Sequence, residues 1–334
     1  MRLRVEDAGA TATHVAHVVQ GRETRAARVP RILHIGKFYP PHRGGMETHL
    51  RDLCERLRPA VDASVLVAGE GDVETTQECI NGVGVTRLRT LFNLGAAPVC
   101  PGLARRIRES RADLVHLHFP NPTAIISYLA SGHRGPLVVT YHSDIVRQKI
   151  MGRAFRPVLE HFLRRARAII VTSPDYLQSS PVLGRFRERC RVIPLGIAPE
   201  QFEGVDAEAV RRIRERYGPR IVLGVGRLIY YKGFAHLVRA MRDVEACLLI
   251  IGTGPLKREL EREREALGEQ RGRVHFLGEV ADAAPYFQAA DVFALSSTAR
   301  SEAFGIVQLE AMACGVPVVN TRLPSGVPYV SPDG

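Results

Sequence analysis

Two glutamates, Glu302 and Glu310, lie in the string SEAFGIVQLE, which carries the strongest chemical signal in the chain. A helix that begins near Glu302 would turn so that these residues, eight positions apart, lie about 80° from each other on one broad face. Two carboxylates on such a face can accept hydrogen bonds from sugar hydroxyls at both ends of a long ligand. The backbone N–H groups of Gly305, Ile306 and Val307 would lie at the N-terminus of that helix, which favours a phosphate. A surface helix with solvated glutamates is the alternative.

Cations and glycines follow the ends of three other predicted strands. Arg227 and Lys232 stand five residues apart in the string GVGRLIYYKG. An arginine can hold two phosphate oxygens at once, while a lysine supplies a compact point charge. Gly254 opens a second turn, and Gly44 and Gly45 precede a predicted helix, where glycines let backbone N–H groups approach an anion. Each feature alone is also explained by a solvated loop or a tight turn.

Three histidines lie on or directly after predicted strands. His142 follows a strand in the string TYHSD, and the carboxyl end of such a strand faces the ligand cleft. We expect it to donate or accept a hydrogen bond near developing charge, with a buried core histidine as the alternative. His116 and His118 alternate on one strand face, but no third ligand has suitable spacing, so packing or cleft lining is favoured. The sequence holds no Asp-x-Asp pair, and we predict no metal site and no cofactor.

Composition bounds the classes of protein to which the chain can belong. Its 334 residues are 45% hydrophobic and 24% charged, which fits roughly two globular domains. No apolar run approaches the ~20 residues of a membrane-spanning helix. The six cysteines include no CxxC pair, which argues against the common zinc and thioredoxin signatures and favours free thiols in the cytoplasm.

The formal net charge of +11 is confined to the first part of the chain. Residues 1–200 hold 29 Lys and Arg against 18 Asp and Glu, whereas residues 201–334 hold 17 of each. Eleven of the basic residues fall between Arg147 and Arg191, beside three acids. Phosphorylated substrates and anionic lipid are candidate partners, and nucleic acid is disfavoured because no aromatic platform accompanies the charge. Solvated helix faces are the alternative.

Short apolar runs alternate with amphipathic stretches, which predicts parallel βαβ units. The fold class is therefore α/β, with two tandem Rossmann-like domains that face a cleft. Strands are expected at 32–36, 64–68, 85–88, 114–118, 137–141, 168–172, 192–194, 221–226, 247–251, 274–277, 292–296 and 316–320. Helices are expected at 46–58, 103–108, 157–166, 207–217, 234–242, 256–266, 283–289 and 303–314.

The proposed boundaries follow from this pattern. They give a disordered leader over 1–30, a first domain over 31–195, a linker over 196–204 and a second domain over 205–334. The chain ends in a loop directly after a strand, so we expect the second domain to be incomplete.

From about residue 31 to its end the chain resembles the family 4 glycosyltransferases, which have the two-domain GT-B fold. The order and spacing of several short strings carry the resemblance: GG at 44–45, VHLH at 115–118, VTYHSD at 139–144, VTS at 171–173, IPLGI at 193–197, GR…KG at 226–233, GTGP at 252–255 and Glu-x7-Glu at 302–310. The resemblance implies a retaining, metal-independent transfer from a nucleotide sugar. The family's chains normally continue with closing helices that return to the first domain.

The resemblance also implies residue roles. Glu302 contacts the donor sugar and Glu310 the ribose, while Arg227 and Lys232 hold the diphosphate. His142 lies beside the donor sugar and the reacting centre. The phosphate and sugar pocket is completed by Gly44, Gly45, Gly254 and the amides of Gly305, Ile306 and Val307.

The expected activity is transfer from a UDP- or GDP-linked sugar to a lipid-linked or glycan acceptor in cell-surface polysaccharide, lipopolysaccharide or glycolipid synthesis. The expected location is the cytoplasm, peripheral at the inner face of the membrane, where Ile150, Met151, Phe155 and Phe162 would insert shallowly. An NAD-dependent sugar-nucleotide oxidoreductase or epimerase is a rival, weakened by the lack of GxGxxG. An inactive, truncated sugar-nucleotide binder is the other rival.

Overall fold

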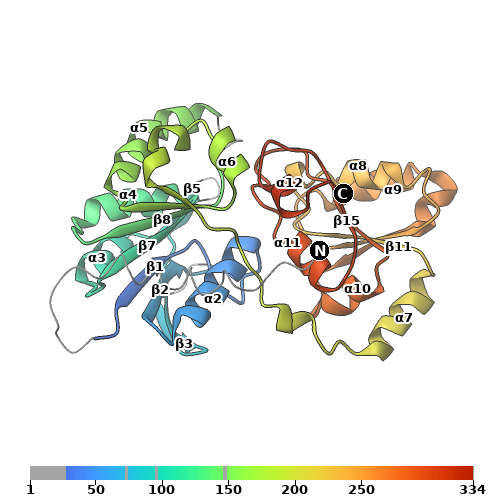
Figure 1. Cartoon of the computed structure of the whole chain (residues 1–334), viewed down its shortest axis with the longest axis horizontal. Coiled ribbons are helices and arrows are strands. Elements are labelled where there is room, and N and C mark those ends of the chain that lie inside the picture. Colours follow the sequence, from blue (N-terminus) through green and yellow to red (C-terminus); the bar gives the residue numbers. More distant parts are fainter. Residues whose placement is uncertain (1–27, 72–73, 95–96, 146–148, 334) are drawn as a thin grey trace.

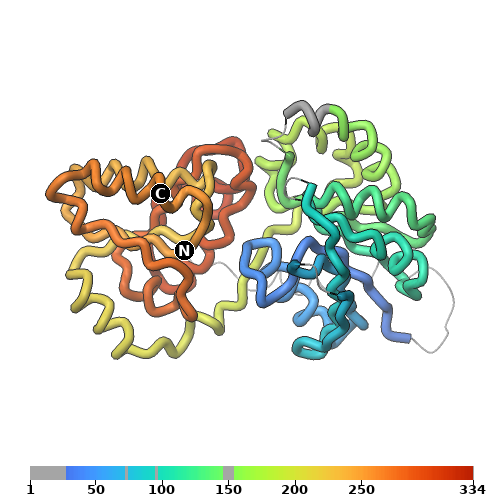
Figure 2. Tube along the Cα trace, turned by 180° about the vertical axis from the view of Figure 1, so that it is seen from behind, coloured from blue at the N-terminus to red at the C-terminus, as the bar shows by residue number. Residues whose placement is uncertain are grey.

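The computed structural model describes residues 28–71, 74–94, 97–145 and 149–333, with backbone only for 149–153. It contains two α/β lobes that stand side by side and are joined by a segment that crosses between them (Figure 1). The view from behind shows the same separation (Figure 2). The prediction of two Rossmann-like domains is confirmed. The predicted leader lies outside the described residues except for 28–30.

The first lobe is built on an eight-stranded sheet of order β10-β9-β8-β7-β1-β2-β4-β3. Every neighbouring pair is parallel except β3 with β4. The strands are β1 (Arg31–Ile35), β2 (Asp62–Ala68), β3 (Thr76–Ile80), β4 (Val83–Leu88), β7 (Leu114–Phe119), β8 (Leu137–Tyr141), β9 (Ala168–Val171) and β10 (Cys190–Val192). A short hairpin of β5 (Phe92–Leu94) and β6 (Ala97–Val99) stands apart from this sheet.

Alternate residues of the central strand β1 pack on opposite faces of the first sheet. Leu33 and Ile35 join the larger core with helices α3 (Leu103–Glu109), α4 (Pro122–Ser131), α5 (Lys149–Arg165) and α6 (Pro174–Ser179). Ile32 packs with Leu50 and Cys54 of α2 (Gly45–Leu57), which covers the other face. His34 therefore points to the face that α2 covers. The turn η2 (Leu183–Arg189) precedes β10.

The second lobe has a fully parallel five-stranded sheet of order β13-β12-β11-β14-β15. Figure 1 shows α8 and α9 on one side of it and α7 and α10 on the other. The strands are β11 (Ile221–Val225), β12 (Cys247–Ile251), β13 (Val274–Gly278), β14 (Val292–Leu295) and β15 (Val318–Asn320). The helices and turns are η3 (Pro199–Phe202), α7 (Ala207–Tyr217), η4 (Tyr230–Lys232), α8 (Phe234–Ala240), α9 (Lys257–Glu265), η5 (Gly268–Arg273), α10 (Ala284–Ala289), α11 (Val307–Ala313) and α12 (Val327–Val330).

Several predicted elements need correction. The helix expected over 303–314 begins only at Val307, because Gly305 has a φ of 74°, which a right-handed helix excludes. The strand expected at 192–194 occupies Cys190–Val192. The antiparallel strand β3 was not predicted, although the pair Asn81-Gly82, with φ of 47° and 78°, is the typical signal of a tight hairpin turn.

The basic stretch of the first lobe is also packed differently from the prediction. Phe162 is fully buried in the first core, and Phe155 packs against that core. Phe162 is therefore not available for insertion into a bilayer, and Phe155 is only partly exposed. The side chains of Ile150 and Met151 lie outside those that the structure describes. In the described part of the chain, no helix has the length and apolar character needed to cross a bilayer.

Loops of the two lobes touch through polar contacts. Arg300 of the second lobe donates to Asp144 Oδ2 at 2.8 Å and to the Ser179 carbonyl oxygen at 2.7 Å. Arg43 of the first lobe donates to the Val280 carbonyl oxygen at 2.6 Å. The facing loops are therefore held against each other rather than separated by bulk water.

Gly233 offers a test of how the second lobe positions its cleft loop. Its φ is 65°, and a Cβ atom there would lie 2.0 Å from the Ser296 carbonyl oxygen. We expect Gly233→Ala to lower the free energy of unfolding by about 2–4 kcal/mol, because backbone strain and a backbone clash add. Gly268 has the same φ with nothing within 4 Å, so Gly268→Ala should cost only about 1 kcal/mol. Chemical denaturation measures both, and equal losses would contradict this reason.

Candidate active site

The candidate site lies where the carboxyl ends of parallel strands from both lobes face each other. Loops after β1 and β8 contribute from the first lobe, and loops after β11 and β14 contribute from the second. Open α/β sheets bind ligands at this edge. Except for Gly254, which follows β12, the site residues predicted from the sequence fall in these loops or at the helix starts that follow them.

A buried ion pair joins Lys232 and Glu302 at the centre of the second lobe's edge. Lys232 Nζ lies 2.6 Å from Glu302 Oε2, and each side chain is only 11% exposed. Ser297, itself fully buried, donates its hydroxyl to the same carboxylate oxygen at 3.0 Å. Burial alone opposes a charge on Lys232, but the neighbouring carboxylates, Glu302 first, raise the pKa of its ammonium above the ordinary value. Lys232 therefore stays charged in a desolvated position.

Glu310 approaches the same ammonium from α11. Burial raises the pKa of Glu310 to about 7, with Lys232 acting in the opposite direction and Asp52 of the first lobe adding to the rise. The expectation that Glu302 and Glu310 share one helix face is wrong, because Glu302 lies in the loop before α11. The two carboxylates meet at Lys232 because the loop turns back at Gly305, not because of helical spacing.

Two further cations, Arg227 and Lys37, lie in loops of the site and form no ion pair with the residues that the structure describes. Arg227 is exposed in the loop after β11 and makes no ion pair or hydrogen bond with the side chains that the structure describes. Lys37, in the loop after β1, lies close enough to Arg227 to feel its charge. The pKa of Lys37 is lowered, first by burial and then by Arg227, while Glu47 acts in the opposite direction. Mutually repelling cations at a cleft are suited to a polyanion such as a diphosphate.

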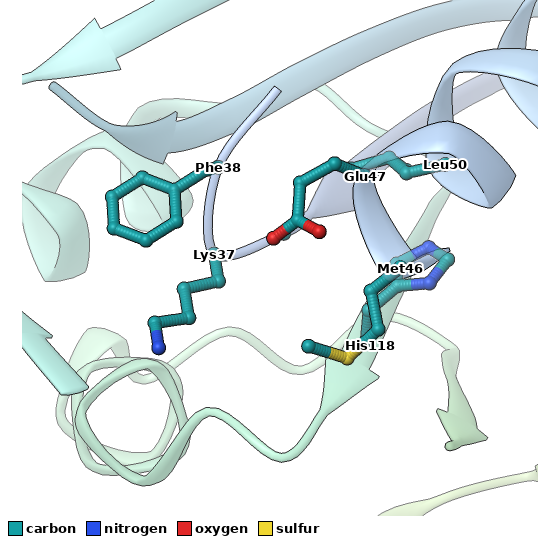
Figure 3. A pocket seen from close by; sticks show the side chains of 7 residues that line it. Lys37, Phe38, Met46, Glu47, Leu50 and His118 are labelled. Atoms are coloured by element: carbon teal, nitrogen blue, oxygen red, sulfur yellow. The ribbon is translucent and has the colours of Figure 1, made fainter. Parts of the chain in front are cut away.

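The role of Lys37 was not predicted from the sequence, although a lysine directly after a buried parallel strand is a usable signal. Lys37 and Phe38 line one side of a small pocket, Met46 and His118 line the other, and the Glu47 carboxylate lies between them (Figure 3). Lys37 and His118, which belongs to the histidine cluster of the first lobe, therefore line the same pocket.

The predicted glycines take three different positions. Gly45 is the first residue of α2, and a Cβ atom there would lie 3.6 Å from Ile306 of the other lobe. Gly44 precedes it in an extended conformation, packed against the Glu47 carboxylate. Gly254 lies under the Arg227 loop, where a Cβ atom would meet the Leu228 carbonyl oxygen at 2.5 Å. Gly254 therefore supports the cation loop rather than offering open space to a ligand.

The backbone N–H groups of Gly305, Ile306 and Val307 find no acceptor among the described residues. The next two amides along the chain, of Gln308 and Leu309, donate to the carbonyls of Gly305 and Ile306 at 2.9 Å. These three N–H groups thus lack an acceptor in the described structure. They lie where the loop passes into α11, near Gly45, and the sequence predicts that they bind an anion or a sugar.

His142 belongs to a buried histidine cluster that has His118 at its centre. Its Nε2 lies 3.1 Å from His118 Nδ1, and its backbone N–H donates to the Phe119 carbonyl at 2.9 Å. Burial lowers the pKa of the His142 and His118 imidazoles well below the usual range, and the charges of neighbouring histidines, His49 among them, act in the same direction. At neutral pH these rings are uncharged.

The expectation that no third ligand accompanies His116 and His118 is wrong. Register pairs His34 of β1 with His116 of β7, and ring nitrogens of His34, His116 and His118 lie within 4.8 Å of one another. His49, His118 and His142 form a second such group. A metal is one possible occupant, but both groups need His118, whose two nitrogens face other histidines.

Known proteins share both the sequence pattern and the fold of this chain. Residues 219–334 match the family described as "Glycosyl transferases group 1", and residues 43–201 match "Glycosyltransferase Family 4". The chain is 34% identical over 310 residues to the D-rhamnosyltransferase WbpZ of Pseudomonas aeruginosa, covering 91% of this chain and 81% of that protein. It is 31% identical over 310 residues to the O-antigen chain mannosyltransferase C of Escherichia coli, covering 91% and 82%. A crystal structure of Anabaena Alr3699/HepE in complex with UDP and glucose superposes with a TM-score of 0.72 at 23% identity, covering 91% and 84%.

The raised pKa of Glu310 predicts a pH dependence of stability. A carboxyl whose pKa is about 7 when folded and about 4.5 when unfolded stabilises the fold fully below pH 4.5, and this contribution is lost as the pH rises through 7. Glu310→Gln removes the loss. The difference in unfolding free energy between the variant and the parent should therefore shift in favour of the variant by about 1–3 kcal/mol as the pH rises from 4.5 to 7.5.

Denaturant titrations across this pH range measure the difference. Glu259→Gln, which alters an exposed glutamate of α9, is the matched control and should track the parent. A Glu310→Gln curve parallel to that of the parent would contradict the burial of this carboxyl as its cause.

Proposed function

The chain belongs to family 4 of the glycosyltransferases, and on that premise we propose that it moves a sugar from a UDP- or GDP-linked donor with retention of anomeric configuration. The acceptor is a lipid-linked or glycan chain in cell-surface polysaccharide, lipopolysaccharide or glycolipid synthesis. Membership of the family sets aside the oxidoreductase alternative. An inactive binder remains the alternative that an assay decides.

The observation that carries this proposal is the desolvated Lys232–Glu302 pair beside the unpaired Arg227. As the glycosidic bond to the diphosphate breaks, negative charge grows on the leaving oxygen. Fixed cations and free N–H groups stabilise such charge without reorganising, and in many enzymes this stabilisation accelerates the reaction more than any other effect. In a front-face retaining mechanism the leaving phosphate takes the acceptor's proton, so no protein nucleophile and no metal are required.

The glutamates suit the two ends of the donor. Glu302, held by Lys232 and Ser297, keeps acceptor lone pairs for sugar hydroxyls. Glu310, from α11, is proposed to accept from the ribose hydroxyls. The names of both relatives refer to sugars of the manno configuration, since D-rhamnose is 6-deoxy-D-mannose. We therefore propose a manno-configured donor sugar.

The basic surface of the first lobe is proposed to hold the enzyme at an anionic membrane from the cytoplasmic side. Seven arginines between 164 and 191 are exposed: Arg164, Arg165, Arg167, Arg185, Arg187, Arg189 and Arg191. Glu160 pairs with Arg164 and Arg185 and removes part of this charge. The binding is proposed to be electrostatic rather than insertional, because Phe162 is buried.

Removing a leaving-group cation tests the proposed chemistry. We expect Arg227→Ala and Lys232→Ala each to lower kcat by about 10²–10³, because the charge that they face grows in the transition state. Lys257→Ala, which removes an exposed cation of α9, should leave kcat unchanged. Transfer from radiolabelled GDP- and UDP-sugars in the presence of a chelator measures all three.

Folding must be checked in the same experiment, because Lys232→Ala leaves the Glu302 carboxylate buried without a cation. Arg227→Ala removes no such partner, so its kinetics give the cleaner result. Unchanged turnover in both folded variants would overturn the assignment of the diphosphate site.

Vesicle binding tests the membrane proposal. Each basic residue near an anionic bilayer contributes about 1 kcal/mol, and salt weakens this attraction. Sedimentation should show binding to anionic vesicles at low salt, less at high salt and none to neutral vesicles. The double variant Arg167→Ser/Arg187→Ser should bind more weakly, whereas Arg258→Ser/Arg262→Ser on α9 should not differ from the parent. Equal binding to neutral and anionic vesicles, or none to either, would contradict the proposal.

A further inference from the structure

Three imidazoles form a continuous chain from the cleft into the first sheet. His142 Nε2 lies 3.1 Å from His118 Nδ1, and His118 Nε2 lies 3.4 Å from His34 Nδ1. His34 is fully buried, and His118 and His142 are 4% and 7% exposed. The chain ends at His34 Nε2, a buried atom without a hydrogen-bond partner in the described structure.

Strand register produces this chain. β1, β7 and β8 are neighbours in the sheet, and their histidines lie on the face that α2 covers. His118 stands opposite Thr140, so His142, two residues further along, is its diagonal neighbour on the same face. The rings of His118 and His142 are nearly parallel, at 20°. Backbone pairing therefore brings these side chains together, and burial restricts the rotation of their rings.

Each imidazole in the chain is neutral, so each carries one proton on one nitrogen. Burial lowers the pKa of His34 to about 3, with His49 adding to the effect, and that of His118 and His142 well below the usual range. Only two ordered arrangements make both hydrogen bonds. The protons lie either all on the Nδ1 atoms or all on the Nε2 atoms.

The unpartnered end of the chain distinguishes the two arrangements. With all protons on Nε2, His34 would bury an N–H donor that has no acceptor. With all protons on Nδ1, His34 buries only a lone pair, and unsatisfied buried donors are the rarer of the two cases in proteins. The second arrangement makes His34 donate to His118 and makes His118 donate to His142.

We infer that His34 and His118 are positioning residues that fix His142 as the Nδ1–H tautomer, so that His142 presents a hydrogen-bond donor, not a base, to the sugar donor. His142 Nδ1 makes no hydrogen bond to another residue that the structure describes. A neutral N–H donor can hold a sugar hydroxyl or ring oxygen but cannot accept the acceptor's proton. This agrees with a reaction in which the leaving phosphate takes that proton.

The position of the proton can be measured directly. In protein labelled with ¹⁵N-histidine, long-range ¹H–¹⁵N spectra separate protonated from unprotonated ring nitrogens, and a His142→Gln sample assigns the signal. We expect the His142 proton on Nδ1. A proton on Nε2 would overturn the inference. Stoichiometric zinc, nickel or copper in the purified protein, measured by mass spectrometry, would also overturn it, because metal coordination uses the same nitrogens.

Variants of His118 test the positioning role. His118→Leu removes the donor, so His142 should revert to the Nε2–H form preferred by free histidine, and kcat should fall by about 10- to 100-fold with little change in KM. His118→Asn keeps an N–H near the Nδ1 position and should restore both the tautomer and most of the turnover. An unchanged His142 tautomer in folded His118→Leu would overturn the inference.

His116→Leu is the matched control. His116 is equally buried and stacks on His118 at a centroid distance of 4.5 Å, but its Nε2 faces Thr140 at 2.7 Å and lies outside the chain. This variant should lose stability without moving the His142 proton. The expected changes in kcat rest on the proposed function, whereas the expected position of the His142 proton does not. Failure to transfer any sugar would refute the function while the spectra still decide the inference.

Discussion

The buried contact between Lys232 and Glu302 is the constraint on which the second half of the site depends. Removing two charges from water costs several kcal/mol per ion, and only good geometry with additional hydrogen bonds offsets that cost. The surrounding loops supply both. Ser297 donates to the Glu302 carboxylate, and Ser296 donates its hydroxyl to the Lys232 carbonyl at 2.9 Å. The left-handed turn at Gly233 lets the lysine loop pack directly on Ser296.

The same contact explains why the cations of the site are not equivalent. Lys232 is held by a carboxylate and is desolvated, so it is a fixed charge that a ligand approaches. Arg227 and Lys37 come from different lobes, and no carboxylate neutralises either at ion-pair distance in the described structure. An anion between the lobes would relieve their mutual repulsion. Binding of a diphosphate would therefore also favour the approach of the two lobes.

The sequence predicts the repeating strands and helices and the loops that carry the site. These features depend on short apolar runs and on glycines, which are local properties of the chain. Lys232, Glu302 and Glu310 lie together in the structure, but the helical spacing predicted to place the two glutamates on one face is wrong. The prediction extended a helical periodicity across Gly305, but the positive φ of Gly305 excludes a helix there. Glu302 instead lies in the loop before α11, and this loop brings its carboxylate to Lys232.

The histidine chain depends on register between strands far apart in sequence, which local patterns do not reveal. His34 precedes His118 by 84 residues, and only the order β8-β7-β1 makes them neighbours. For the same reason His116 and His118 looked like an incomplete metal site. Lys37 was overlooked because the cation that it neighbours, Arg227, belongs to the other lobe.

The contact between Arg300 and Asp144 links the two parts of the site. Arg300 is two residues before Glu302, and Asp144 is two residues after His142. Asp144 is itself fixed by the hydroxyls of Tyr141 and Ser180, at 2.8 and 2.9 Å. Through this ion pair, the loop that carries Glu302 is held against the loop that carries His142. Separation of the lobes would break this ion pair and move Glu302 away from His142, so the two side chains belong to one site only while the lobes are in contact.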